Sequence, residues 1–167
     1  MAASDTAPGS VGSLSGLRAL GMGMVGLCLL QYVVGMVLNL FVSIPRHHPG
    51  TSGPNYFGRA LQSDLWGLSQ GGLLAIHVAV GVLLLVGSWR LAVAAFQAPR
   101  SGLRAVSILA LLAVVAAGFN GASFLSYGQN LSSMIMAASF AIAMFCFSWV
   151  IFRAAGTYGP DPVSAAL

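Results

Sequence analysis

Residues 73–89 read LLAIHVAVGVLLLVGSW, and they lie within a stretch from Leu65 to Trp89 that contains no Asp, Glu, Lys or Arg. A helix needs roughly 20 apolar residues to cross the hydrocarbon core of a membrane, and this stretch is long enough. Its one ionisable side chain is His77. Ionisable groups at that depth are rare and generally mark a functional contact. The stretch therefore predicts a membrane-spanning helix with a candidate site at His77.

Two more uncharged segments account for three further spans. One runs from Ala19 to Pro45, and the other runs from Ala105 to Phe152 and is divided by the polar turn 126–130. Only 6% of the 167 residues are charged, against about 25% in a typical soluble domain. The sequence thus predicts an all-α fold, a four-helix transmembrane bundle. We place its spans near 19–44, 68–93, 105–126 and 131–152, within a membrane domain of residues 19–153.

The segments outside the spans predict two tails and one long loop. Residues 1–18 are small and polar and lack the basic start and cleavage site of a signal peptide, so we expect a flexible tail and a retained first span. Residues 154–167 predict a second tail. The loop 46–67 begins with closely spaced Pro and Gly, which argue against a regular helix. Ser63 and Asp64 suit the start of an extended second span.

The arginines predict the orientation of the chain. One set falls on the side that carries both termini, and a smaller set falls in the loop 46–67. Positive residues are enriched in cytoplasmic segments, so we expect both termini in the cytoplasm of a multi-pass protein of the bacterial cytoplasmic membrane. Because the arginines form no basic patch, the pI near 9.7 does not indicate nucleic-acid binding. The first set is Arg18, Arg90, Arg100, Arg104 and Arg153, and the second is Arg46 and Arg59.

Small and polar residues repeat at helical spacing in each span. In the first span, Gln31, Gly35 and Asn39 recur every four residues, which favours close helix packing in a bilayer. The second span carries such residues on two faces, so we expect it to be central. The ends 87–90 (GSWR) and 147–150 (FSWV) also suggest two duplicated helical hairpins.

A polar layer is predicted in the half of the bundle near the 46–67 loop. Its members are His77, Asn39, Asn120 and Met136, from four different spans. Imidazole can ligate iron or hydrogen-bond a carbonyl, so His77 is a candidate haem b or quinone ligand. Met136 could supply a thioether, and the asparagines could bind haem propionates or a quinone headgroup. The alternative is structural: His77 hydrogen-bonds Asn39 or Asn120 across a helix interface.

Other polar residues give weaker signals. His47 and His48 are adjacent and have no third ligand at suitable spacing, so we expect a solvated or interfacial loop and no metal. If that loop folds back over the bundle, these histidines and Arg59 could cover the polar layer and meet an anionic group. Cys28 and Cys146 are expected to pack as small hydrophobic residues.

Two family resemblances follow from the first hairpin. The segments 31–39 (QYVVGMVLN) and 43–45 (SIP), leading to 76–79 (IHVA), resemble one helix pair of the haem A synthase type of four-helix bundle. This resemblance implies a haem-ligand role for His77. It extends no further, because the last span has no histidine and no span has a Glu. The segments 44–50 (IPRHHPG) and 55–57 (NYF) resemble small four-span membrane proteins of actinobacterial type.

The sequence offers little catalytic equipment. Its acidic residues are Asp5, Asp64 and Asp161, and it contains no Lys. No phosphate-binding loop and no Ser/His/Asp set is evident, so we expect no catalytic residues. The first hypothesis is a non-catalytic integral membrane protein, an accessory or partner subunit of a complex or a homo-oligomer in the lipid bilayer. The alternative is a haem- or quinone-binding redox bundle centred on His77.

Overall fold

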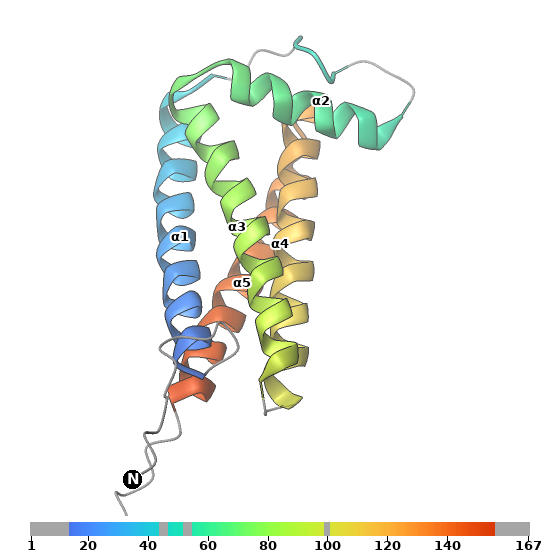
Figure 1. Cartoon of the computed structure of the whole chain (residues 1–167). Helices are drawn as coiled ribbons and strands as arrows, with labels where there is room; N and C mark the ends of the chain where they lie inside the picture. Colours follow the sequence, from blue (N-terminus) through green and yellow to red (C-terminus); the bar gives the residue numbers. More distant parts are fainter. Residues whose placement is uncertain (1–13, 44–46, 52–54, 99–100, 156–167) are drawn as a thin grey trace, which may run out of the picture.

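The structure, a computed structural model, describes residues 14–43, 47–51, 55–98 and 101–155. Within these ranges it contains helices only (Figure 1). They are α1 (Leu14–Phe41), α2 (Tyr56–Ser69), α3 (Gly72–Gln97), α4 (Ser101–Tyr127) and α5 (Asn130–Ala155). The predicted all-α fold is therefore confirmed.

Four of these helices are long and apolar enough to cross a membrane. Each of α1, α3, α4 and α5 has at least 26 residues, which spans about 39 Å at 1.5 Å per residue. The fold is the predicted four-helix transmembrane bundle. The bounds differ in places, because α1 begins at Leu14 within the expected tail and α3 ends at Gln97, four residues beyond the expected 93. The rest of both predicted tails lies outside the described residues.

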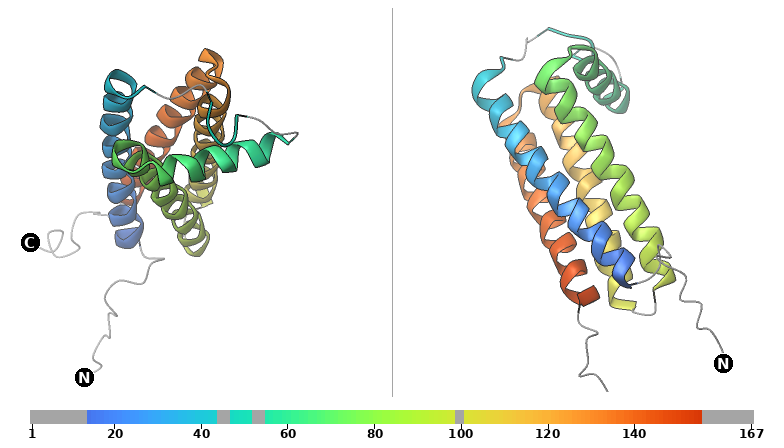
Figure 2. Two further views of the ribbon diagram at one scale, coloured as in Figure 1. Left: turned by 90° about the horizontal axis from the view of Figure 1, so that it is seen from above. Right: turned by 60° about the vertical axis from the view of Figure 1, so that its left-hand side comes forward.

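The long helices form a ring of four in which no helix is central. α1 packs against α3 and α5, and α4 packs against the same two helices. The diagonal pairs α1–α4 and α3–α5 have no Cα atoms within 8 Å of each other. Figure 2 shows this arrangement from above and from the side. The expectation of a central second span was wrong, since α3 has two long neighbours like every other long helix. Helix pairs α1–α3 and α4–α5 are both in contact, whereas their duplication stays a prediction.

The short helix α2 lies across one end of the bundle, which we call the α2 end (Figure 2). It packs against α3 and α4. The side chain of Asn55 caps its first turn by accepting hydrogen bonds from the backbone N–H of Phe57 and Gly58, at 3.1 and 3.5 Å. Gly71 and Gly72 then adopt positive φ values of 68° and 59°, which favour glycine, and separate α2 from α3.

This helix corrects two predictions. The loop 46–67 was expected to lack a regular helix, and Ser63–Asp64 was expected to begin the second span. The structure instead places both residues in the middle of α2. The physical reason is that every proline of the loop precedes residue 55, so no proline falls inside α2.

The core of the bundle combines large apolar side chains with close backbone approaches. Cys28 and Cys146 are buried and unlinked, as expected of small hydrophobic residues. At Gly87 of α3, an added Cβ would meet the sulfur of Met24 on α1. At Gly21 of α1, it would lie 3.0 Å from Ile151 on α5. Glycines thus let α1 approach both of its neighbours, as small residues do in membrane bundles.

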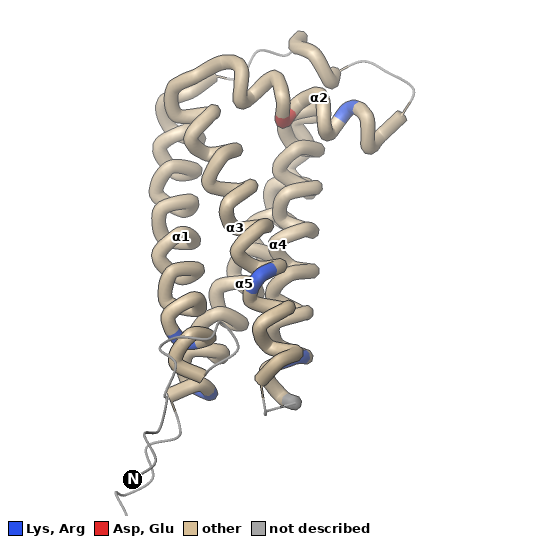
Figure 3. The backbone as a smooth tube through the Cα atoms, in the orientation of Figure 1, with Lys and Arg blue, Asp and Glu red and all other residues tan. Residues whose placement is uncertain are grey.

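Most of the charged residues that the structure describes lie toward the two ends of the bundle (Figure 3). At the end opposite α2, where α1 begins and α5 ends, lie Arg18, Arg104 and Arg153, while α2 carries Arg59 and Asp64. Arg90 lies about two turns before the end of α3 and is exposed. Arg46 and Arg100 lie outside the described residues. The described arginines thus follow the two sets on which the orientation prediction depends.

Candidate functional site

His77 on α3 pairs with Gln31 on α1. The Nε2 atoms of the two side chains lie 3.2 Å apart. In this orientation the amide nitrogen of Gln31 donates, so His77 Nε2 accepts and the imidazole proton is assigned to Nδ1. Gly35 leaves room for the imidazole, and Gly81 lies beside the amide at an ordinary contact distance. An added Cβ at Gly35 would lie 3.1 Å from His77 Cε1, and one at Gly81 would lie 3.7 Å from Gln31 Nε2.

The pair leaves two buried polar atoms without a hydrogen bond. They are Nδ1 of His77 and Oε1 of Gln31, and neither has a partner among the described residues. Turning the amide by 180° would exchange its two atoms but would still leave one ring nitrogen and one amide atom unpaired. Each unsatisfied buried group costs about 1–3 kcal/mol. The contact thus joins α1 to α3 and retains unused hydrogen-bonding capacity inside the bundle.

The structure does not assemble the predicted polar layer. Asn39 is exposed on α1. Asn120 donates to the carbonyl of Ala116 in its own helix, at 2.8 Å. Met136 packs on Gly121, where an added Cβ would lie 3.3 Å from its sulfur. Its helix α5 lies diagonally opposite α3, with no Cα atoms of the two helices within 8 Å.

The expected structural partner of His77 was therefore wrong. Gln31 takes the place of Asn39 or Asn120. A signal for this pairing was present in the sequence. Gln31 and Gly35 are four residues apart, and so are His77 and Gly81. On each helix the polar side chain and the glycine therefore share one face.

These contacts bear on the haem ligation that the resemblance implies. The Nε2 atom of His77 is occupied by Gln31, and its Nδ1 atom is buried. Met136 stands on the helix diagonally opposite. As packed here, ligation of a haem through His77 Nε2 would require the hydrogen bond to Gln31 to break.

A second polar cluster joins the segment 47–51 to the α2 end. His48 is buried, with 9% of its surface exposed, whereas His47 is exposed. The ring nitrogens of His48 lie 2.8 Å from the carbonyl oxygen of Pro49 and 2.9 Å from that of Leu125 on α4. Its ring stacks on Trp66 of α2, with centroids 4.1 Å apart and planes 13° apart. The segment thus folds back over the bundle, as the sequence allowed.

Arg59 of α2 anchors the same segment. Its Nε donates to the carbonyl of Gly50 at 3.2 Å, and its Nη2 donates to that of Thr51 at 2.6 Å. The guanidinium also lies 4.3 Å from the ring centre of Tyr127 on α4, a cation–π distance. Its donors are directed at backbone carbonyls. Arg59 therefore acts here as a structural clamp, whereas the expected contact with an anionic group stays a prediction.

Serine hydroxyls and one carboxyl complete the cluster. The Oγ atoms of Ser63 on α2 and Ser126 on α4 lie 2.7 Å apart. The next residue, Asp64, is half-buried. Burial raises the pKa of Asp64 from its ordinary value of 3.8 to about 6, because desolvation disfavours the charged form. Asp64 therefore changes charge in a mildly acidic range.

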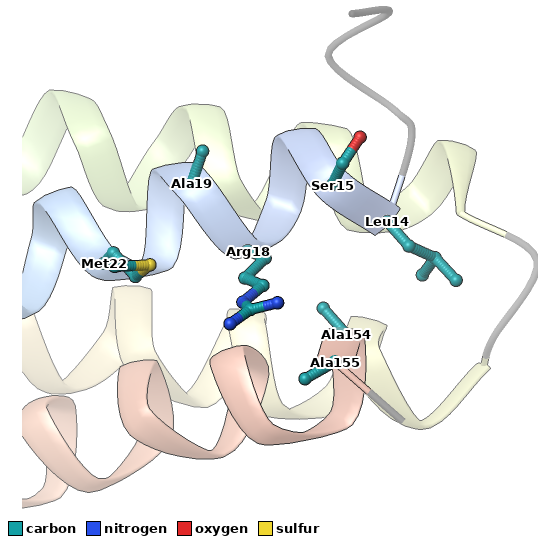
Figure 4. Close-up of a pocket in the computed structure, with 7 residues that line it drawn as sticks. All are labelled: Leu14, Ser15, Arg18, Ala19, Met22, Ala154 and Ala155. Atoms are coloured by element: carbon teal, nitrogen blue, oxygen red, sulfur yellow. The ribbon is translucent and has the colours of Figure 1, made fainter. Parts of the chain in front are cut away.

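A pocket of about 370 Å³ opens at the opposite end of the bundle (Figure 4). The start of α1 and the end of α5 form it, and the Arg18 side chain points from α1 toward Ala154 and Ala155. A cation near the C-terminus of a helix is stabilised by the helix dipole. The remaining lining is mostly small or apolar, so we do not treat this pocket as a candidate binding site. It is lined by Leu14, Ser15, Arg18, Ala19, Met22, Ala154 and Ala155.

Comparisons with protein-family models, with curated proteins and with solved structures found no match.

Proposed function

We propose that this integral membrane protein is a non-catalytic accessory or partner subunit of a membrane complex. The observation that carries the proposal is an uncovered apolar stripe on α2. The stripe consists of Phe57, Leu61, Leu65 and Leu68, all of which are exposed. Their spacing places them along one flank of the helix. Another face of α2 carries the buried residues Ala60, Ser63 and Gly67, which point toward the bundle.

The two flanks of α2 differ in what covers them. On one flank, Trp66 and Arg59 are covered by the segment 47–51. The apolar stripe lies on the other flank, with Asp64 between it and the bundle. Phe57 makes an edge-to-face contact with Phe119 of α4, with ring centroids 5.4 Å apart. Even so, 66% of the surface of Phe57 stays exposed. Large exposed apolar patches mark interaction sites.

We assign this stripe to a second membrane protein whose contacting face is apolar and carries a basic side chain opposite Asp64. A carboxyl that is already partly desolvated gains from an opposite charge in a way that lipid tails do not offer. The partner contact would thus return Asp64 to its charged form. Lipid alone on the stripe is the competing outcome.

Site-specific photo-crosslinking in native membranes tests this assignment. A photoreactive residue replaces Leu65 on the stripe or, as the matched control, Leu112 on α4. These side chains are 57% and 59% exposed. We expect a discrete protein adduct from position 65, weakened by Asp64→Asn, and no such adduct from position 112. Lipid adducts alone at both positions would overturn the proposal.

We further propose that both termini face the cytoplasm of a cell membrane, which places the α2 end outside. The distribution of the described arginines over the two ends supports this orientation (Figure 3). A membrane-impermeant thiol reagent applied to intact cells tests it, after Cys28 and Cys146 are replaced by Ala. Labelling of His47→Cys but not of Ser4→Cys is expected. The reverse pattern would reject the orientation.

A quinone-binding bundle is the second candidate, and one observation favours it. The unpartnered Nδ1 of His77 could donate to a quinone carbonyl, because the imidazole proton is assigned to that atom. Quinone extracted from the purified protein would establish this candidate if it is absent from His77→Leu and present in Asn39→Leu. Extracts of the unmodified protein without quinone would remove this candidate. If the purified protein shows a Soret absorption band that is lost in His77→Leu, the bound cofactor would be a haem.

A further inference from the structure

The His48 side chain is held by two backbone carbonyls at once. Its Nδ1 lies 2.8 Å from the oxygen of Pro49, and its Nε2 lies 2.9 Å from the oxygen of Leu125. A carbonyl oxygen can only accept, so both hydrogen bonds need an N–H on the ring. A neutral imidazole has one N–H, whereas the imidazolium has two. Satisfying both contacts therefore requires the protonated ring.

One face of the ring meets an aromatic group that attracts positive charge. One face of His48 stacks on Trp66 at 4.1 Å, and an indole face attracts cations. Nearby on α2, Arg59 turns its donors to Gly50 and Thr51, whereas half-buried Asp64 lies on the other flank of α2, away from Trp66. The other titratable neighbours are Tyr127 on α4, which faces Arg59, and exposed His47. On α3 and α5, Arg90 and Arg153 belong to the distal halves of their helices.

We propose that the segment 47–51 is a pH-dependent latch, closed over the end of α4 by protonated His48 and released when His48 loses its proton. The closed form binds one proton more than the open form, so falling pH favours closure and rising pH favours opening. Each pH unit would change the closed-to-open ratio by up to about tenfold, by proton linkage. The latch does not depend on the proposed subunit role.

Opening would change the environment of Trp66, and this change can be measured. The chain has three tryptophans, so Trp89→Phe and Trp149→Phe leave Trp66 as the reporter. A stacked imidazolium quenches indole fluorescence. In purified full-length protein we expect Trp66 emission to rise in one step as the pH increases and the latch opens. Hydrogen exchange at residues 47–51 should accelerate over the same step.

Three variants of the reporter protein identify the titrating group. His48→Gln should abolish the step, because glutamine does not titrate. His47→Gln should retain it, since His47 is exposed and outside the contact. Asp64→Asn should also retain it, which distinguishes His48 from Asp64, whose pKa is raised to about 6. A step that persists in His48→Gln or disappears in Asp64→Asn would overturn the latch.

Nitrogen NMR of histidine-labelled native protein gives a test that does not depend on any variant folding. At the acidic end of the step, both ring nitrogens of His48 should carry protons. At the alkaline end, one of them should be deprotonated while the exchange of the 47–51 amides is faster. A neutral His48 ring at the acidic end, with those amides still protected, would contradict the proposal.

Discussion

The side chains of His77 and Gln31 form a hydrogen bond between α3 and α1, with their Nε2 atoms 3.2 Å apart. The bond lies in helices that could cross the membrane, where water does not compete for the donor. Gly35, four residues after Gln31 on α1, provides the space for the imidazole. His77 therefore has a structural role that its sequence position alone did not identify.

Gly35→Ala should weaken the α1–α3 contact. The new Cβ would lie 3.1 Å from His77 Cε1, and the ring is held in place by Gln31, so we expect a loss of about 1–2 kcal/mol from overpacking. Gly26→Ala is the matched control, because a Cβ there meets nothing within 4 Å. It should be neutral or slightly stabilising. Unfolding by denaturing detergent measures both, and equal losses would argue against the close approach.

Gly50→Ala should disrupt the segment 47–51. Gly50 has a φ of 97°, which disfavours any other residue, and an added Cβ would lie 2.7 Å from the Arg59 carbonyl oxygen and collide with Ser63. We expect a loss of about 2 kcal/mol or more. Gly58→Ala, where the nearest atom is 3.9 Å away, should instead gain about 0.5–1 kcal/mol from helix propensity. Hydrogen exchange at 47–51 provides the readout, and unchanged protection in Gly50→Ala would contradict this geometry.

Asp64 should make the protein less stable as pH rises from about 4 to about 6. Its pKa is raised to about 6 in the folded protein, so the folded state binds more protons than the unfolded state in that window. Asp64→Asn should reduce this slope and stabilise the protein above pH 6, by about 1 kcal/mol once solvent screening of the half-exposed group is allowed for. Gln62→Ala is a control that should leave the slope unchanged. Detergent unfolding at several pH values measures it, and an identical slope in Asp64→Asn would refute the assignment.

The bundle could be predicted from the sequence because a bilayer imposes a strong and simple rule. Every spanning helix must be apolar for about 20 residues, and the uncharged segments around Cys28, His77 and Cys146 satisfy it over their full length. The same rule did not predict helix α2, which is too short to cross a membrane. The helix begins directly after three closely spaced prolines, Pro45, Pro49 and Pro54. We extended their helix-breaking effect too far along the chain and so missed the cap at Asn55.

The candidate site was harder to predict than the bundle. The sequence gives the depth of a residue along its helix, but it does not say which neighbouring helix the side chain faces. Asn39 and His77 were placed at similar depth, but Asn39 is exposed. The hydrogen-bond partners of His48 could not be predicted, since both acceptors are backbone carbonyls, those of Pro49 and Leu125. Backbone groups carry no signature in the sequence, and Leu125 becomes a neighbour only after the chain has folded.

A double-mutant cycle on Gln31 and His77 tests the structural role of this pair most directly. Gln31→Leu and His77→Leu each remove one partner and leave the other buried and unsatisfied, at a cost of about 1–3 kcal/mol. The free energy of unfolding in detergent should show a coupling of about 0.6–2 kcal/mol between them, so that the double variant loses less than the sum of the single losses. Additive losses, with a coupling near zero, would contradict the account.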